Sequence, residues 1–162
     1  MGNLQTDQIR DGFFVLLITL LVFFLETCFF HLVLYTKDYL NASLIIVFVL
    51  LGLSLGSFLL NFISNLKRHH IIIMVLGFII SIYPAFLNIV FYPQYYTYSP
   101  IILLPFAFAG FILPSFFRVH HSGRMYFFDL TGAVLGIMAS IVLIPMVRIE
   151  NCVFIAGSAM AV

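Results

Sequence analysis

Two acidic residues interrupt long apolar stretches of this sequence, and their chemistry is the first thing to explain. Glu26 lies near the middle of such a stretch, with Val22, Phe23, Phe29 and Phe30 around it. A carboxylate inside a bilayer costs a few kcal/mol even on lenient scales, so Glu26 must face protein or a wet cavity. Two interpretations stay open. Glu26 could couple protons or contact a substrate, or it could form a structural hydrogen bond between the first and second helices.

Asp129 is the second acid, and small residues share its helix face. Gly132 and Gly136 follow it at steps of three and four residues, which places all three on one side of a helix. Because intramembrane charges usually pair, we expect Asp129 to form an ion pair with Arg118, Arg124 or a basic residue of the second loop. A functional acid is the alternative.

The expected second helix has polar and small residues on different faces. Gly52 and Gly56 are four residues apart, a spacing that lets another helix backbone approach closely. The polar residues form a stripe at three- and four-residue steps that could face Glu26: Ser54, Ser57, Asn61 and Ser64. We therefore expect this helix to be central in the bundle and to be contacted on two faces.

The histidines do not form a metal-binding pattern. His31 lies within the first helix, as a polar residue of the bundle or as an anchor near its outer end. His69-His70 and His120-His121 are adjacent pairs, and neighbouring helix residues diverge by about 100° without a further ligand at i+3 or i+4. We interpret both pairs as loop histidines at the membrane interface and predict no metal site.

No pattern in the sequence predicts catalysis. Cys28 and Cys152 are too few for a disulfide framework, and we expect both to be free thiols. The sequence has no Gly-rich phosphate loop after a strand, no nucleophile elbow and no carboxylate pair in a catalytic context. We therefore predict no catalytic residue and no cofactor for these 162 residues.

The elements that must position these residues are membrane helices. The chain is 64% hydrophobic and 8% charged, whereas soluble domains carry roughly a quarter charged residues. Its mean hydropathy is +1.19, and its net charge of +1 gives no indication of nucleic-acid binding. Continuous apolar runs near 20 residues predict helices that span the bilayer. We place them, after an N-terminal tail at 1–11, at about 12–36, 42–66, 71–91, 100–117 and 125–147.

A sixth apolar run covers 152–162 and is too short to cross a bilayer. We interpret it as a truncated sixth helix of a longer protein, or alternatively as a short re-entrant or interfacial tail. The predicted fold class is thus an all-α membrane protein, a bundle of five transmembrane helices plus a partial sixth.

Basic residues predict the orientation, because loops rich in Lys and Arg stay in the cytoplasm. Lys37 and Arg148 flank one side of the expected bundle. The other side has five basic residues: Arg10, Lys67, Arg68, Arg118 and Arg124. We therefore expect a cytoplasmic N-terminus in a multi-pass cell-membrane protein, and the bacterial inner membrane fits this topology.

Four segments, in order, resemble one family. They are Glu26, Leu50–Ser57, Leu104–Gly110 and Gly123–Gly136. Together they resemble the N-terminal membrane region of spermidine-synthase-like integral membrane proteins. In that family an arginine typically follows the first acid by five residues, where this chain has His31.

The resemblance implies that a soluble Rossmann-like domain, similar to polyamine aminopropyltransferases, follows the membrane region and lies outside this sequence. The chain would then anchor that domain in the lipid bilayer, without catalysis of its own, and could self-associate. One alternative is a fragment of a major-facilitator-like transporter for a small cationic or amphipathic solute, with Glu26 and Asp129 as its cation contacts. The other alternative is a purely structural membrane subunit.

Overall fold

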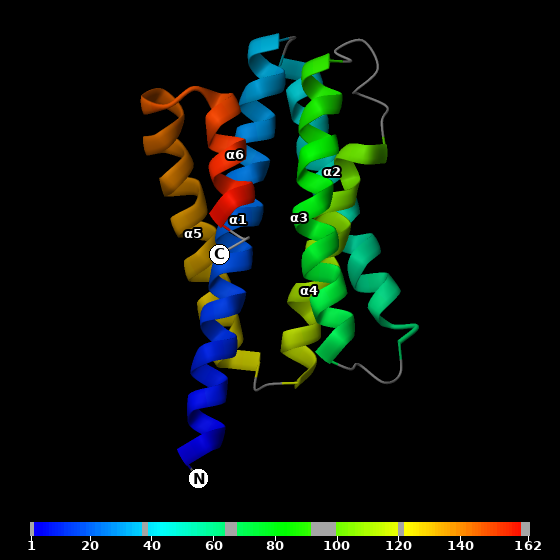
Figure 1. The fold of residues 1–162 in the computed structure, drawn as a ribbon, viewed down its shortest axis with the longest axis vertical. Helices are drawn as coiled ribbons and strands as arrows, with labels where there is room; N and C mark the ends of the chain where they lie inside the picture. The colour runs from blue at the N-terminus through cyan, green and yellow to red at the C-terminus, as the bar shows by residue number, and fades with distance from the viewer. Residues whose placement is uncertain (1, 37–38, 64–67, 92–99, 120–121, 160–162) are drawn as a thin grey trace.

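The structure, a computed structural model, describes residues 2–36, 39–63, 68–91, 100–119 and 122–159, and this part of the chain is helical without strands. The helices in order are α1 (Gly2–Thr36), α2 (Tyr39–Leu60), α3 (Arg68–Phe91), the short 3₁₀ helix η2 (Pro100–Ile102), α4 (Leu103–Val119), α5 (Ser122–Met146) and α6 (Ile149–Ala159). Successive long helices run in opposite directions (Figure 1).

Five helices are long and apolar enough to cross a membrane, with spans of 19 to 28 residues. Their outer surfaces are also apolar, since Leu130, Val134 and Ile141 of α5 are each more than half exposed. Such a surface is unfavourable in water and is the one expected in contact with lipid. The prediction of a helical bundle with five helices long and apolar enough to span a membrane is therefore confirmed. α6 has 11 residues, fewer than the roughly 20 that a crossing requires.

Two helix boundaries differ from the sequence expectations by more than three residues. α1 begins at Gly2, so residues 2–11, expected as a tail, continue the first helix. α2 ends at Leu60, well before the expected end at 66. There the backbone changes to i to i+3 hydrogen bonds, of which Asn61 N to Phe58 O is the first at 3.1 Å. Asparagine side chains compete for backbone groups and disfavour helix interiors, which explains an end at this position.

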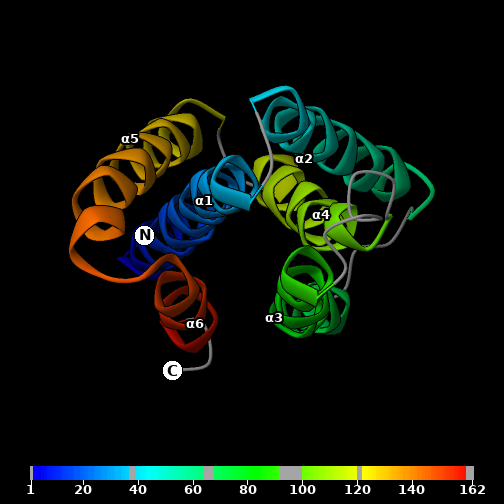
Figure 2. The ribbon, with the colours of Figure 1, turned by 90° about the horizontal axis from the view of Figure 1, so that it is seen from above.

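The bundle consists of two groups of helices. α1 packs along α5 with α6 beside it, and α4 packs between α2 and α3, as the view along the bundle shows (Figure 2). Aromatic pairs join the groups: Phe29 of α1 meets Phe106 of α4 edge-on at 6.2 Å between ring centroids. Further along, Phe14 and Phe116 are 5.4 Å apart. The core therefore lies along α1 and α4, the two most buried helices.

Glycines allow the closest helix contacts within each group. A Cβ on Gly56 of α2 would collide with the backbone of α4 at Ala107 and Gly110. A Cβ on Gly52 would come within 2.8 Å of the Phe106 Cβ. Gly132 of α5 likewise lies against a backbone carbonyl of α1. The expected packing glycines thus all lie at close crossings, two between α2 and α4 and two between α1 and α5.

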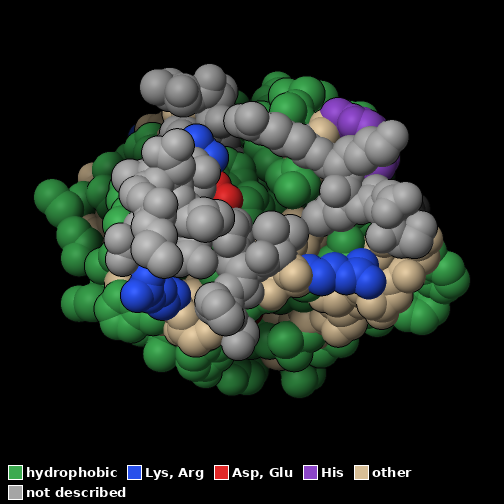
Figure 3. Space-filling view, turned by 90° about the horizontal axis from the view of Figure 1, so that it is seen from below, with side chains coloured by type: hydrophobic (Ala, Val, Ile, Leu, Met, Phe, Trp, Pro, Cys, Tyr) green, Lys and Arg blue, Asp and Glu red, His purple; other side chains and the backbone are tan. Residues whose placement is uncertain are grey.

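Basic side chains lie at separate positions on the end of the bundle where α1 begins (Figure 3). Arg10, Arg118 and Arg124 lie there and are exposed. Arg118 also directs Nη1 toward the Ile63 carbonyl oxygen after α2, at 3.4 Å. Arg148, in the turn between α5 and α6, lies at the opposite end. Lys37 and Lys67 lie outside the described residues.

Candidate functional site

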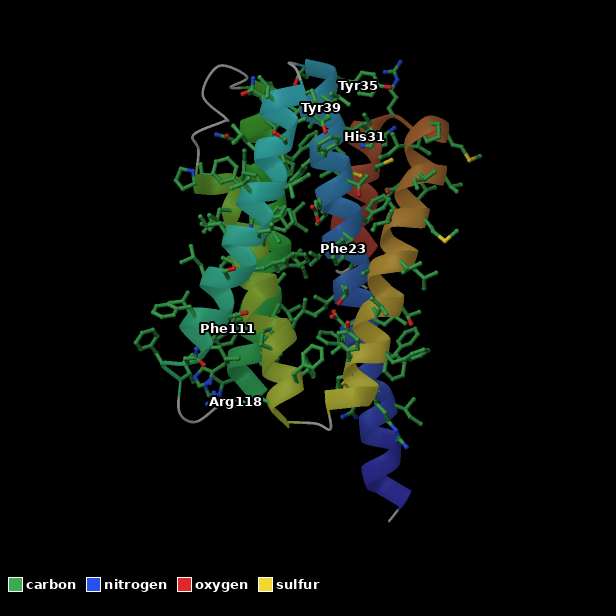
Figure 4. The ribbon with its side chains drawn as sticks, turned by 180° about the vertical axis from the view of Figure 1, so that it is seen from behind. Phe23, His31, Tyr35, Tyr39, Phe111 and Arg118 are labelled. Carbon is green, nitrogen blue, oxygen red and sulfur yellow. The ribbon has the colours of Figure 1, made fainter. Side chains whose placement is uncertain are left out.

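Glu26 lies in a lateral groove of the bundle. The groove has a volume of about 350 Å³, and α1 forms its floor between α2 and α5. Figure 4 looks into this side of the bundle and shows Phe23 and His31 on α1. The lining residues are Phe23, Glu26, Thr27, Phe30 and His31 of α1, Ile46 of α2 and Ile137 of α5. We call this the Glu26 groove.

The helical repeat explains why these α1 residues share one face. Phe23, Glu26, Thr27, Phe30 and His31 follow steps of three, one, three and one residues, which keep side chains on one side of a helix. Ten residues separate Glu26 from Thr36, where α1 ends. At a rise of 1.5 Å per residue this is about 15 Å along the helix axis. The carboxyl group therefore lies within the apolar length of the helix.

The polar atoms of the groove are hydrogen-bond acceptors. The Thr27 hydroxyl donates to the Phe23 carbonyl oxygen at 2.8 Å, so its lone pairs remain available. His31 Nδ1 lies 2.9 Å from the Thr27 carbonyl oxygen. Because a carbonyl only accepts, this bond requires the proton on Nδ1, and Nε2 of the neutral ring is left as an acceptor. Within the described ranges, the Glu26 carboxyl forms no hydrogen bond or ion pair.

Aromatic rings close the groove at the end near Thr36. Phe30 meets His31 edge-on at 5.7 Å and Tyr39 of α2 at 6.4 Å between centroids. His31 also lines an open cavity of about 790 Å³ beyond this end, formed with Tyr35, Arg148 and the turn between α5 and α6. His31 thus separates the Glu26 groove from the end of the bundle.

The polar residues expected on one face of α2 do not line the Glu26 groove. Ser57 donates to the Gly110 carbonyl oxygen of α4 at 3.0 Å, and Ser54 donates to the Leu50 carbonyl oxygen of its own helix. Asn61 is exposed beyond the end of α2, and Ser64 lies outside the described residues. The expected contact of this stripe with Glu26 is therefore not seen. α2 instead presents Ile46 to the groove.

Asp129 accepts a hydrogen bond from a residue that the sequence reasoning missed. Thr19 of α1 donates its hydroxyl hydrogen to Asp129 Oδ1 at 2.6 Å. The expected ion pair with Arg118 or Arg124 is not seen among the described side chains. Asp129 joins α1 to α5 and does not line the Glu26 groove. Threonine is common in apolar helices, so Thr19 gave no signal beyond its polarity.

The two cysteines come together although 124 positions separate them in the sequence. Both are buried, and their thiols are in hydrogen-bonding contact between α1 and α6. His69 and His70, expected in a loop, instead lie in the first turn of α3 with ring centroids 4.1 Å apart. His120 and His121 lie outside the described residues. Among the side chains that the structure describes, no three His, Cys, Asp or Glu residues are arranged to hold a metal ion.

Comparisons of the chain with protein-family models, with curated proteins and with solved structures found no match.

Proposed function

We propose that this chain is the membrane-embedded domain of a protein resembling the spermidine-synthase-like integral membrane proteins. In this proposal it anchors a soluble aminopropyltransferase-like domain, encoded beyond residue 162, and the chain itself carries out no catalysis. The five apolar helices support the membrane-embedded part of the proposal. The remainder depends on the resemblance of four sequence segments.

The observation that best supports the resemblance is where those segments lie. Leu50–Ser57 and Leu104–Gly110 contain Gly56 and Gly110, which face each other's helices at the crossing of α2 and α4. Gly123–Gly136 contains the glycines at the crossing of α1 and α5. The resembling segments thus coincide with the contacts that determine how the helices pair. Small residues at such crossings let helix backbones approach closely, so their positions bear on how a membrane fold packs.

We further propose that the N-terminus is cytoplasmic, in a bacterial inner membrane. The exposed arginines at the end where α1 begins support this orientation, because basic residues are retained in the cytoplasm. A sixth helix completed beyond residue 162 would return the chain to the cytoplasm and place the soluble domain there.

The experiment that tests the proposal is to sequence the gene beyond Val162. We expect a strand, a Gly-rich turn and an acidic residue at the end of the second strand, as in Rossmann-like domains. Expression of the whole product should then give aminopropyl transfer to an amine in membrane fractions. A series of further membrane helices without such a domain would overturn the anchor function.

Transport of a small solute is a second candidate, and the Glu26 groove favours it. A carboxyl without a partner among the described residues, in a groove open to the side of the bundle, is a feature of solute pathways as well as of packing. Uptake assays with Glu26→Gln and Asp129→Asn test this candidate. Unchanged flux with an intact fold would remove both acids from a transport mechanism.

A further inference from the structure

The Glu26 groove has a chemical character that the anchor function does not specify, and it narrows the class of cationic or amphipathic solute named for the transport alternative. Its rims are Ile46 of α2 and Ile137 of α5, each about two-fifths exposed on the outer surface of the bundle. Its floor contains Phe23 and Phe30 together with the polar groups of α1. The groove therefore opens sideways, from the apolar surface of the bundle toward a carboxyl group.

The polar groups specify the kind of ligand that would fit. The carboxylate of Glu26, the hydroxyl oxygen of Thr27 and Nε2 of His31 are three acceptors, because the donors of Thr27 and His31 are used by backbone carbonyls. An anion would find no free donor among them and would be repelled by the carboxylate. A protonated primary amine offers three N–H donors and the opposite charge.

We propose that the Glu26 groove binds a lipophilic organic cation: a protonated amine attached to a small apolar or aromatic body that enters from the bilayer. Glu26 binds the ammonium group by a charge-assisted hydrogen bond, and Thr27 and His31 accept its remaining N–H groups. The apolar body lies between Ile46 and Ile137. Phe23 and Phe30 add ring faces, which attract cations.

The size and depth of the groove agree with this ligand class. A volume of about 350 Å³ is at the lower end of the range of small-molecule pockets. At this depth little water competes for the carboxylate, so an ammonium partner stabilises its charge more strongly than at a surface. The inference requires neither the downstream domain nor transport, and its failure would leave the anchor proposal unchanged.

The test uses the 162-residue protein in lipid nanodiscs and ¹⁹F NMR with 4-(trifluoromethyl)phenethylamine as the probe. The matched neutral probe is 4-(trifluoromethyl)phenylethanol, which has a similar body but no positive charge. We expect saturable binding of the amine above the background of empty nanodiscs. Binding should weaken at least tenfold for the alcohol and for Glu26→Gln, since both remove the charge-assisted hydrogen bond.

Two further variants test whether amine binding depends on the groove itself or on any acidic residue of the protein. Ile46→Phe narrows the groove without changing its charge, and it should weaken amine binding. Asp11→Asn removes an acid near the beginning of α1, outside the groove, and should leave binding unchanged. Equal binding of amine and alcohol, or equal amine binding by Glu26→Gln and the unsubstituted protein, would overturn the proposal.

A second measurement does not depend on how well the variants fold. A lipophilic carbodiimide should label the unsubstituted protein at Glu26. The carboxylic acid adds across one C=N bond to give an O-acylisourea, which rearranges to a stable N-acylurea without a leaving group. A free primary amine can also attack the O-acylisourea and form an amide with release of the urea, so labelling is counted as N-acylurea plus amide at Glu26. Bound amine should lower this total, and the alcohol should not. Absence of labelling at Glu26, or equal protection by both probes, would contradict a cation site open to the bilayer.

Discussion

Thr19 of α1 and Asp129 of α5 are joined by a hydrogen bond of 2.6 Å, in which the threonine hydroxyl donates to Oδ1 of the carboxyl group. Thr19 is fully buried at the interface of the two helices. The bond lies beside a close contact of the pair, because Gly132, one turn after Asp129, meets the Leu16 carbonyl. An interhelical hydrogen bond and a close contact at a glycine thus hold α1 and α5 together at the same place.

Thr19→Val should lower the stability of the bundle. Valine keeps the shape of threonine but removes the donor, and Asp129 then loses its partner at the helix interface. Interhelical hydrogen bonds in membranes contribute about 0.6 kcal/mol on average and up to about 1.7 kcal/mol, so the decrease in unfolding free energy should fall in this range. Thermal unfolding in detergent, followed by circular dichroism, measures it.

Thr131→Val is the matched control for this substitution. Its hydroxyl donates to the Phe127 carbonyl oxygen of its own helix, so this hydrogen bond does not join two helices. The control should change the unfolding temperature little. Equal decreases for both variants would show that the bond from Thr19 to Asp129 does not stabilise the interface.

Alanine at Gly56 should destabilise the pairing of α2 with α4. Its Cβ would meet backbone atoms at Ala107 and Gly110, which cannot rotate away as a side-chain end could. Overpacking of this kind typically costs about 1–3 kcal/mol. Gly123→Ala is the control, because nothing lies within 4 Å of a Cβ at that position. An unfolding temperature lowered equally by both would contradict the close crossing.

Cys28 and Cys152 should form a disulfide when an oxidant reaches them. Their thiols are in contact between α1 and α6, so diamide can take two hydrogens and two electrons from the pair with little helix movement. The oxidised protein should resist alkylation by N-ethylmaleimide after denaturation until a reductant is added. Mass spectrometry after alkylation counts the free thiols.

Cys28→Ser provides the control for this experiment. The remaining Cys152 has no thiol partner in the chain and should stay open to alkylation after the same oxidation. If both cysteines of the unsubstituted protein remain alkylated after diamide treatment, α6 does not lie against α1 as the structure places it.

The helices and their glycine crossings could be predicted from the sequence because both depend on local patterns. Apolar length identifies a span, and a spacing of four residues places Gly52 with Gly56, and Gly132 with Gly136, on one face. The surroundings of Glu26 could not be predicted in the same way. They depend on which helices become neighbours, and α2 turned out to direct Ser57 toward α4 and Ile46 toward Glu26.

Asp129 illustrates the same limit for charged groups. Arginines at the same end of the bundle made an ion pair the natural expectation, since pairing lowers the cost of an intramembrane charge. Arg118 instead directs its guanidinium toward the carbonyl of Ile63, three residues after the end of α2. The partner of Asp129 is instead the buried hydroxyl of Thr19 on the neighbouring helix, and neither Arg118 nor Arg124 forms the expected ion pair with it.

The proposed orientation predicts which end of the bundle is accessible from outside the cell. Gly123 and Met146 are exposed residues at opposite ends of α5, so cysteines there report on the two sides without changing any charge. In a Cys28→Ser, Cys152→Ser background, a membrane-impermeant maleimide added to intact cells should label Met146→Cys. It should label Gly123→Cys only after the cells are permeabilised.

The physical reason for this result is the distribution of arginines. Arg10, Arg118 and Arg124 are exposed at the Gly123 end, whereas Arg148 is the described arginine near Met146. Moving basic side chains across the membrane is opposed during insertion, so the end with more of them stays inside. Labelling of Gly123→Cys in intact cells, with Met146→Cys protected, would invert the bundle and place its N-terminus outside. Labelling of both in intact cells, while a cytoplasmic control protein stays unlabelled, would show that two orientations coexist and would contradict a single cytoplasmic N-terminus.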